Sequence, residues 1–251
     1  MTRILALLFL LLPAAALARA PQGADVTTQP EYYTSTNAEG LDSLAFLPPP
    51  PETDSIAFLL DQARYQDGLA KRNGPAGKQA REDAIALKLH ETFSQPFGVE
   101  ISKEGTPAIY NLLYSIAGEL GDMATRSAKQ GYFRPRPYVV HNDTTCYPEE
   151  EEILRNNGSY PSGHSARGWG LALLLAEINP DNKEAILKRG YDSGQSRVIC
   201  GYHWQSDVDA GRLAGAAAIA SLHANPLFQE RLKKAIEEFA GLKKTGKVTI
   251  H

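Results

Sequence analysis

Three observations on the sequence predict an all-α fold, built as a single-domain helical bundle. Apolar residues recur at spacings of three and four over most of residues 54–240, as expected for amphipathic helices. No alternating strand pattern of any length is present, and no internal repeat is visible. About 231 residues follow an N-terminal leader, enough for one large domain.

The leader is the stretch MTRILALLFLLLPAAALARA, residues 1–20, which has the pattern of a secretory signal peptide. Arg3 gives a positive start, a short apolar run follows, and Pro13 ends that run before several small residues. The apolar run is too short for a membrane span. We expect cleavage after Ala18 or Ala20 and export to the periplasm.

Residues 21–53 are polar and Pro-rich and end in the stretch LPPPPETDS. Runs of proline favour an extended polyproline conformation, so this segment is expected to be an N-terminal arm and not a domain. The helical domain of the chain is then expected over residues 54–243, with residues 244–251 as a tail.

The first two helices of that domain are expected near its N-terminal end. Asp54 is a candidate N-cap for the first helix. The apolar face of this helix is expected to carry Ile56, Leu59, Leu60 and Ala63. A second helix is expected over residues 79–93.

The clearest helix begins in the stretch EGTPAIYNLL. Thr106 is a candidate N-cap, and Pro107 occupies the first helical position, where a missing N–H removes no helical hydrogen bond. One apolar stripe runs along this helix: Ile109, Leu112, Leu113, Ile116, Leu120 and Met123.

Four more helices are expected in the second half of the chain. One follows the stretch PSGH and runs to about Ile178, and the next lies within NPDNKEAILKRGYDSG. Residues 206–223 form a helix rich in alanine and glycine, which can pack closely on its neighbours. Pro226 separates it from a last helix over residues 227–240.

The charge balance limits the partners of the protein. Removal of the leader, with Arg3 and Arg19, leaves 24 of the 26 basic side chains against 29 acidic ones, a net charge of −5. A general nucleic-acid partner requires a basic face, so none is expected, although a local basic pocket stays open. No other apolar run is long enough to span a membrane, so no membrane partner is expected either.

Cys146 and Cys200 are the two cysteines of the chain. In an exported protein an even pair favours a disulfide. Two buried thiols are the alternative, because the sequence gives no distance between them.

Three polar clusters stand out between residues 129 and 207. They are KQGYFRPRP with Lys129, Arg134 and Arg136, then PSGH from Pro161 to His164, then SRVICGYHWQSD with Ser196, Arg197, His203 and Asp207. Singly, each fits an ordinary structural role: basic side chains at a helix end, a helix cap, or a local hydrogen bond.

Together the clusters hold what a phosphate dianion requires. Arginine offers forked donors to phosphate oxygens, and the helix that starts after PSGH offers free backbone N–H groups. Gly163 lets an anion approach the backbone because it has no Cβ, and Ser162 can cap the helix or donate to the anion.

The two histidines and the carboxylate add a route to catalysis. An imidazole can act as a covalent nucleophile. A carboxylate on its Nδ1–H fixes the tautomer and leaves Nε2 free to attack. A second imidazole can protonate the leaving oxygen.

The order and spacing of the clusters resemble a known three-part signature. Lys129-x6-Arg136-Pro137, Pro161-Ser162-Gly163-His164 and Ser196-Arg197-x5-His203-x3-Asp207 are similar to the motifs of the type 2 phosphatidic acid phosphatase superfamily, which includes the vanadium haloperoxidases. The stretches LPPPPETDSIAFLLDQARY, GDMATRSAK and NGSYPSGH resemble the bacterial class A non-specific acid phosphatases, over roughly residues 45–240.

This resemblance implies an acid phosphatase without metal or cofactor, which hydrolyses small phosphate monoesters, nucleotides included, through a phosphohistidine. His203 would be the nucleophile, Asp207 would orient it, and His164 would be the general acid and then the base. The phosphate would be held by Lys129, Arg136, Arg197, Ser162 and Gly163. The family also suggests a homo-oligomer and, in some relatives, phosphate transfer to alcohols.

Two other functions compete with this hypothesis. A haloperoxidase would hold vanadate in the same cradle, but the acid-phosphatase-like stretches outside the cradle argue against it. A phosphate-binding protein without turnover would need the cations but neither His164 nor His203. No group of histidine, cysteine and acidic residues has the spacing of a zinc site, so no metal is expected.

Overall fold

The computed structural model describes residues 41–85 and 88–251, and this part of the chain is helical, without a β-strand. The all-α prediction is therefore confirmed. The predicted signal peptide and most of the predicted arm, up to residue 40, lie outside the described residues. No helix in the described ranges is long and apolar enough to cross a membrane.

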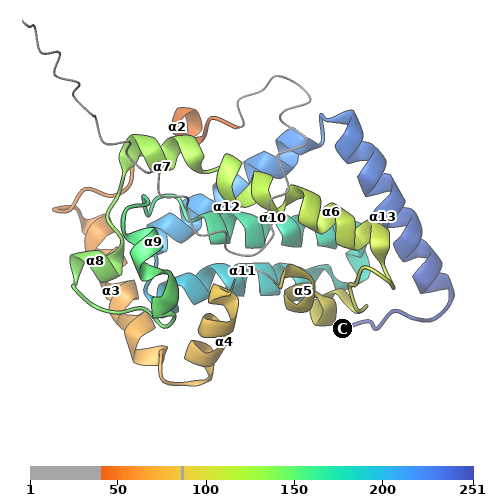
Figure 1. The fold of residues 1–251 in the computed structure, drawn as a ribbon, viewed down its shortest axis with the longest axis horizontal. Helices are drawn as coiled ribbons and strands as arrows, with labels where there is room; N and C mark the ends of the chain where they lie inside the picture. The colour runs from red at the N-terminus through yellow and green to blue at the C-terminus, as the bar shows by residue number, and fades with distance from the viewer. Residues whose placement is uncertain (1–40, 86–87) are drawn as a thin grey trace, which may run out of the picture.

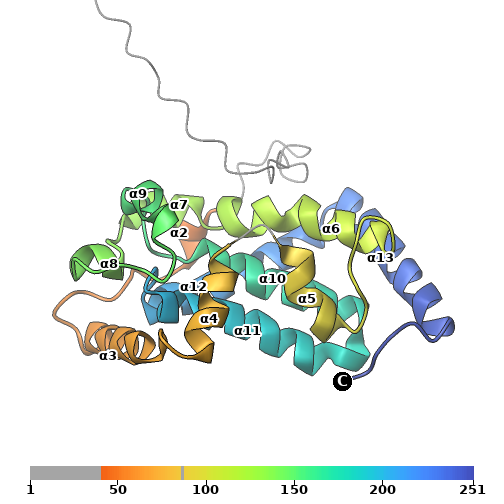
Figure 2. The same cartoon turned by 60° about the horizontal axis from the view of Figure 1, so that its bottom comes forward.

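Three long helices form the centre of the molecule (Figure 1). α10 (Gly163–Ile178) packs against both α11 (Lys183–Cys200) and α12 (Gln205–Leu222). α6 (Pro107–Gly118) and α13 (Pro226–Lys244) pack on each other along one side of this centre, as both views show (Figures 1 and 2). The second and third polar clusters lie around the N-terminal ends of α10 and α12 and the C-terminal end of α11.

The remaining elements surround this centre, and all of them except α3 are short. They are α2 (Ser43–Phe46), α3 (Ile56–Lys71), α4 (Pro75–Ala84), α5 (Leu89–Phe97), the π-helical turn η1 (Glu119–Met123), α7 (Arg126–Tyr132), α8 (Pro137–Val140), η2 (Pro148–Glu150), α9 (Glu151–Arg155) and η3 (Pro180–Asn182). Part of the predicted arm is thus helical: α2 packs on α7, and its Ser43 side chain forms hydrogen bonds with that helix.

α6 is the helix that the sequence predicts best. Thr106 is its N-cap and Pro107 its first residue, and Ile109, Leu112 and Ile116 on the predicted stripe are buried. The two carboxylate oxygens of Glu238 in α13 accept hydrogen bonds from the free N–H groups of Ala108 and Ile109, at 3.1 and 2.9 Å. A helix distant in sequence therefore caps the start of α6, which no local pattern indicates.

The helix predicted over residues 79–93 is wrong. α4 ends at Ala84 and α5 begins only at Leu89, so two shorter helices replace one. The apolar spacing continues across this break because both helices bury a face, Ala80 and Ala84 in one and Leu89 and Phe93 in the other. Periodicity reports such faces but not a change of direction between them.

α3 differs from its prediction in cap and in face. Ser55, not Asp54, is the N-cap, and its hydroxyl accepts from the Phe58 N–H at 3.1 Å. The predicted apolar face points outward: Ile56 is 85%, Leu59 60% and Leu60 56% exposed. The inward face instead carries Phe58, Asp61, Tyr65 and Gly68. The two aromatic rings pack on Trp204, and Asp61 accepts from Arg134.

α12 confirms the expected close packing of a helix rich in small residues. A Cβ on Gly211 would lie 2.4 Å from the Ser162 carbonyl oxygen, and one on Gly215 would lie 2.2 Å from that of Ala166. Real Cβ atoms do not approach backbone oxygens so closely. The two glycines therefore bring α12 directly against the first turns of α10.

The two cysteines form a disulfide, as one of the two alternatives predicted. The bond joins Cys146, in the loop after α8, to Cys200 at the end of α11, and the Cys146 N–H donates to the Cys200 carbonyl at 2.9 Å. The loop before α9 is thereby fastened to the helix end that carries Arg197.

Candidate active site

His203 and Asp207 lie together where the loop after α11 meets the first turn of α12. Nδ1 of the buried His203 ring is 3.3 Å from Oδ2 of Asp207. The same oxygen accepts a hydrogen bond from the backbone N–H of Trp204, at 2.8 Å. An acidic side chain that reaches back to the N-cap N–H is a common helix start, and here it also sets the position of the histidine.

Two further side chains hold the Asp207 carboxylate. Ser159 Oγ lies 2.5 Å from Oδ2 and 3.3 Å from Nδ1 of His203. Arg134 Nη1 donates to the other oxygen at 2.6 Å, and its Nη2 donates to Asp61 of α3 at 2.7 Å. Arg134, which belongs to the first basic cluster of the sequence, thus pairs with two buried carboxylates instead of facing the cavity.

Arg136 fixes the protonation pattern of the His203 ring. Its Nη1 lies 3.1 Å from His203 Nε2, and a guanidinium can only donate. Nε2 therefore carries the lone pair and Nδ1 the proton directed at Asp207, as assigned from this network. The Arg136 side chain is itself held by the carbonyl oxygens of Leu154 and Asn157, at 3.0 and 3.1 Å from Nε.

Arg197, in the last turn of α11, is fully buried. Its Cζ lies 4.2 Å from the ring centre of Tyr202, and none of its three side-chain nitrogens has a hydrogen-bond acceptor among the described residues. A buried guanidinium without acceptors is costly, because it loses its hydration. An anion in contact with its edge would supply those acceptors.

Lys129 reaches the same region from α7. Its Nζ donates to the Gly158 carbonyl oxygen at 2.8 Å. Burial, and then the neighbouring Arg136 charge, lower the pKa of Lys129 to about 7. The positive charge of this lysine is thus held only weakly near neutral pH, and an anion beside it would strengthen it.

The start of α10 explains the position of the PSGH motif. Ser162 is the buried N-cap; its Oγ lies 3.3 Å from the donating Ser165 N–H and 2.9 Å from Ser165 Oγ. A Cβ on Gly163 would lie 2.3 Å from the Gly121 carbonyl oxygen of η1. Gly163 is therefore required for the contact between α10 and η1, whereas the sequence argument assigned it to the approach of an anion.

A cavity of about 280 Å³ collects most of the predicted residues. Its volume lies just below the range of ordinary small-molecule sites, roughly 300–1,000 Å³. The predicted site residues that line it are Lys129, Arg136, Gly163, His164, Arg197 and His203. Asp207 lies behind His203, and the hydroxyl of Ser162 is used for the helix cap, so neither lines the cavity.

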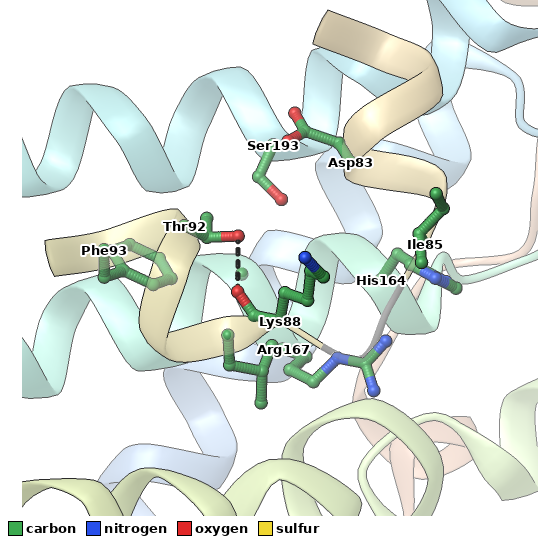
Figure 3. A pocket seen from close by; sticks show the side chains of 10 residues that line it. Asp83, Ile85, Lys88, Thr92, Phe93, His164, Arg167 and Ser193 are labelled. Carbon is green, nitrogen blue, oxygen red and sulfur yellow. Dashed lines mark hydrogen bonds between the residues drawn. The ribbon is translucent and has the colours of Figure 1, made fainter. Parts of the chain in front are cut away.

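A second, smaller cavity lies on the other side of His164 and is shown in Figure 3. Its volume of about 30 Å³ exceeds the roughly 10–15 Å³ that a cavity needs in order to hold one water molecule. Asp83 on its wall pairs with Arg189 and accepts from Ser196 Oγ, the latter at 2.6 Å. Ser196 of the third cluster therefore ties α11 to α4 and is not directed at the larger cavity.

Burial and cations both act on the two histidines. Burial, followed by Arg136 and Lys129, holds the pKa of His203 well below its usual value. Burial, followed by Arg197 and Arg167, does the same to the pKa of His164. Both rings are neutral at neutral pH in the free protein, and negative charge in the cavity raises both pKa values.

No three histidine, cysteine or acidic side chains come together as metal ligands within residues 41–85 and 88–251. The cavity wall instead carries four cationic groups, one ammonium and three guanidinium groups, beside two imidazoles, and its Asp122 carboxylate pairs with Arg126. Such a set suits an oxyanion.

Sequence reasoning missed three residues of this site: Ser159, Asp61 and Arg167. Ser159 lies two residues before Pro161, and only this closeness to PSGH indicated weakly that it belongs to the site. Asp61 gave none, because α3 reaches Arg134 only through the fold. Arg167 follows His164 by three residues, a spacing that places both on one side of α10, and this signal was available.

Comparisons with known proteins agree with this architecture. The family model described as PAP2 superfamily matches residues 108–230. The non-specific acid phosphatase of Providencia stuartii is 53% identical over 226 residues, 89% of this chain and 91% of that protein. The non-specific acid phosphatase of Salmonella typhimurium is 46% identical over 202 residues, 80% of this chain and 81% of that protein. The acid phosphatase of Zymomonas mobilis is 32% identical over 221 residues, 86% and 83% of the two chains.

All residues that line the larger cavity lie within the region that the family model covers. The chain belongs to the PAP2 superfamily and, within it, to the non-specific acid phosphatases.

Proposed function

We propose that this protein is an exported acid phosphatase that hydrolyses phosphate monoesters through a phosphohistidine intermediate. The observation that carries the proposal is the pairing of a histidine on the cavity wall, whose unprotonated Nε2 accepts from Arg136, with a fully buried guanidinium that has no acceptor among the described residues. The first is a nucleophile and the second an oxyanion ligand.

In the first step, Arg136 Nη1 transfers its hydrogen bond from His203 Nε2 to a phosphoryl oxygen, Nε2 attacks phosphorus, and the bond from phosphorus to the ester oxygen breaks. The Nδ1–H bond to Asp207 stabilises the positive charge that develops on the ring. Lys129, Arg136 and Arg197 bind the three non-bridging oxygens as charge develops on them. The departing alcohol oxygen takes its proton from His164.

In the second step, water attacks the phosphohistidine and the N–P bond breaks, releasing phosphate. His164, now neutral, accepts the proton of the attacking water. For the first step His164 must be protonated although its pKa is depressed in the free protein. Binding of the phosphate dianion raises that pKa, and an acidic medium favours the same protonation state, so we expect an acidic optimum.

The breadth of substrates has support in the surroundings of the cavity. A groove of about 430 Å³ adjoins it at Lys129 and Asn157 and is flanked by the exposed side chains of Phe133 and Ile153. An open groove places few demands on the shape of the leaving group, nucleotides included. It also admits an alcohol in place of water, which is the requirement for phosphate transfer.

Chelation tests the proposed independence from metal. The three cations of the cradle can balance the charge of the transition state without a divalent ion. Activity is expected to survive exhaustive treatment with EDTA. Loss of activity that Mg²⁺ or Zn²⁺ restores would contradict the proposal.

Export and assembly complete the proposal. The N-terminal signal-peptide pattern supports a periplasmic location, and the disulfide suits an oxidising compartment. The exposed apolar face of α3, with Ile56, Leu59 and Leu60, supports a homo-oligomer, because such a patch is covered in many assemblies. Light scattering on the mature protein measures the assembly.

The two histidines provide the main test, because they are expected to fail differently. His203→Ala removes the covalent step, so no phosphoenzyme forms and turnover falls by several orders of magnitude. His164→Ala removes the general acid, a loss of about 10²–10⁴-fold. That loss is expected to shrink for p-nitrophenyl phosphate, whose leaving group needs no proton, and to stay large for alkyl phosphates.

The measurement is the trapping of labelled phosphoenzyme by rapid quench, together with steady-state rates on both kinds of ester. His141→Ala, an exposed histidine outside the cavity, serves as the matched control. Label trapped by His203→Ala, or equal losses on both esters in His164→Ala, would show that the roles are assigned wrongly.

A further inference from the structure

Arg167 is a fourth cation in the cavity that the proposed mechanism does not use. It lines the 280 Å³ cavity together with Arg136, Arg197 and Lys129. It has no hydrogen-bond or ion-pair partner among the described residues. Its stem packs against η1, where a Cβ on Gly121 would lie 3.6 Å from Arg167 Cβ.

The carboxylates on the two cavity walls pair with other residues, and Glu150 acts on Arg167 through its charge without a hydrogen bond or ion pair to it. Asp122, on the wall of the larger cavity, pairs with Arg126. Asp83, on the wall of the smaller one, pairs with Arg189 and Ser196. The positive charge of Arg167 is therefore not neutralised by a direct contact, and its guanidinium is available to a ligand.

The proposed step places the leaving group on the side of the cavity where Arg167 lies. His203 attacks phosphorus in line with the departing bond, so the leaving oxygen lies opposite His203, next to its proton donor His164. Arg167 is three residues after His164 on α10, which makes the two side chains neighbours on one helix face. Figure 3 shows the Arg167 guanidinium and the His164 ring at the same end of the smaller cavity, and both also line the larger one.

We infer that Arg167 forms a second-anion subsite for substrates whose leaving group is itself a phosphate, such as pyrophosphate and nucleoside diphosphates. The inference rests on the proposed function of the cavity. The scissile phosphoryl group occupies the cradle of Lys129, Arg136 and Arg197, and the adjacent phosphoryl group, joined through the leaving oxygen, meets Arg167. A guanidinium binds two phosphate oxygens at once through its forked donors.

The bond changes are those of the monoester reaction. The bond from His203 Nε2 to the terminal phosphorus forms, and the bond from that phosphorus to the bridging oxygen breaks. The released phosphate, or nucleotide, is a weakly basic anion, so like p-nitrophenolate it departs without requiring a proton from His164. Arg167 stabilises the negative charge that collects on this leaving group, which is larger than for an alcohol because the group is already anionic.

The test compares pyrophosphate with p-nitrophenyl phosphate in Arg167→Gln and in the matched control Arg64→Gln. Arg64 is an exposed arginine of α3, paired with Asp67 and outside the described cavities. Both substrates have good leaving groups, so a change in His164 acidity on removal of Arg167 affects both and cancels in the ratio of their kcat/KM values. ADP serves as a second diphosphate.

In Arg167→Gln the ratio of kcat/KM for pyrophosphate to that for p-nitrophenyl phosphate is expected to fall by about 10- to 100-fold, the loss typical of one charged hydrogen-bonding pair. Arg64→Gln is expected to leave it unchanged within about twofold. Calorimetry with methylenebisphosphonate, which is not hydrolysed, is expected to show a matching loss of affinity.

An unchanged ratio in Arg167→Gln, an equal loss on both substrates, or no hydrolysis of pyrophosphate by the wild type would overturn the subsite. These results leave the phosphatase proposal in place as long as p-nitrophenyl phosphate is hydrolysed. Failure of the wild type to hydrolyse either substrate would instead remove the proposed function and, with it, the subsite.

Discussion

At the scale of single residues, Asp207 is the best-connected group of the site. It contacts Ser159, Arg134, Trp204 and His203 at distances between 2.5 and 3.3 Å. These contacts leave the carboxylate little freedom to rotate. His203 is therefore held in place on the cavity wall before any substrate arrives, which the proposed nucleophilic role requires.

Ser159→Ala is expected to reduce kcat/KM by about 10-fold without unfolding the protein, because one neutral-to-charged hydrogen bond typically contributes about 1.5 kcal/mol or more. Ser159 touches both Asp207 and His203, so the pH profile of kcat/KM is expected to shift as well. Ser159→Thr keeps the hydroxyl and is expected to recover most of the loss. Unchanged rates and an unchanged pH profile in Ser159→Ala would mean that this hydroxyl only fills space.

Residue types and spacing predicted the cavity wall well, but not what supports it. His203, Arg136 and Arg197 stand out because their clusters together hold the cations and the imidazole that phosphate chemistry requires. Asp61 and Arg134 form a buried ion pair at 2.7 Å, yet an aspartate in an amphipathic helix looks like a solvent-exposed residue. Only the packing of α3 over the start of α12 turns it inward.

At the scale of elements, glycines decide how closely α12 approaches α10. Gly215→Ala would place a Cβ 2.2 Å from the Ala166 carbonyl oxygen, and neither backbone can yield without moving a helix. We expect a loss of about 1–3 kcal/mol in the free energy of unfolding, the usual cost of forced overpacking. The first turn of α10 moves with this contact, so activity is expected to fall too.

Gly241→Ala in α13 is the matched substitution, because a Cβ there would meet no described atom within 4 Å. Alanine in an exposed helix is favoured over glycine by roughly 0.5–1 kcal/mol, so this variant is expected to be more stable than the wild type. Urea unfolding of both variants measures the difference. Equal effects of the two substitutions would contradict the packing argument.

Helix existence was easier to predict than helix boundaries or the face that turns inward. α6 was clear because Thr106, Pro107 and its apolar stripe agree with one another. α3 was misjudged because Ile56, Leu59 and Leu60 form a face that looks like a core face but is exposed in this chain. Periodicity shows that a face is apolar and does not show what covers it.

At the scale of the whole molecule, the site holds several buried cationic side chains whose charges are not fully balanced by acidic side chains in contact with them. Lys129, Arg136 and Arg197 all have pKa values lowered chiefly by burial, and their mutual repulsion adds to the effect on Lys129 and Arg197. Oxyanion binding relieves this repulsion. Bound phosphate is therefore expected to raise the free energy of unfolding, because it neutralises these cations in addition to forming contacts with them.

This stored charge makes the stability of the free protein depend on pH. The pKa values of His164 and His203 in the folded state lie below those of the unfolded chain, near 6.5. Below that pH the unfolded chain binds more protons than the folded one, so the free energy of unfolding falls as the pH falls. Each unprotonated histidine contributes a slope of up to about 1.4 kcal/mol per pH unit.

Removing the histidines is expected to flatten this dependence. Between about pH 6.5 and 5, His203→Asn and His164→Asn should each lose part of the decline in unfolding free energy, and the double variant should lose most of it. His141→Asn, an exposed histidine outside the cavity, is the control and should keep the wild-type slope. Urea unfolding at several pH values, without phosphate in the buffer, measures all four. A double variant that declines as steeply as the wild type would show that these two buried rings are not the source of acid sensitivity.

Added inorganic phosphate should reduce the wild-type decline, because an anion in the cavity raises both histidine pKa values toward those of the unfolded chain.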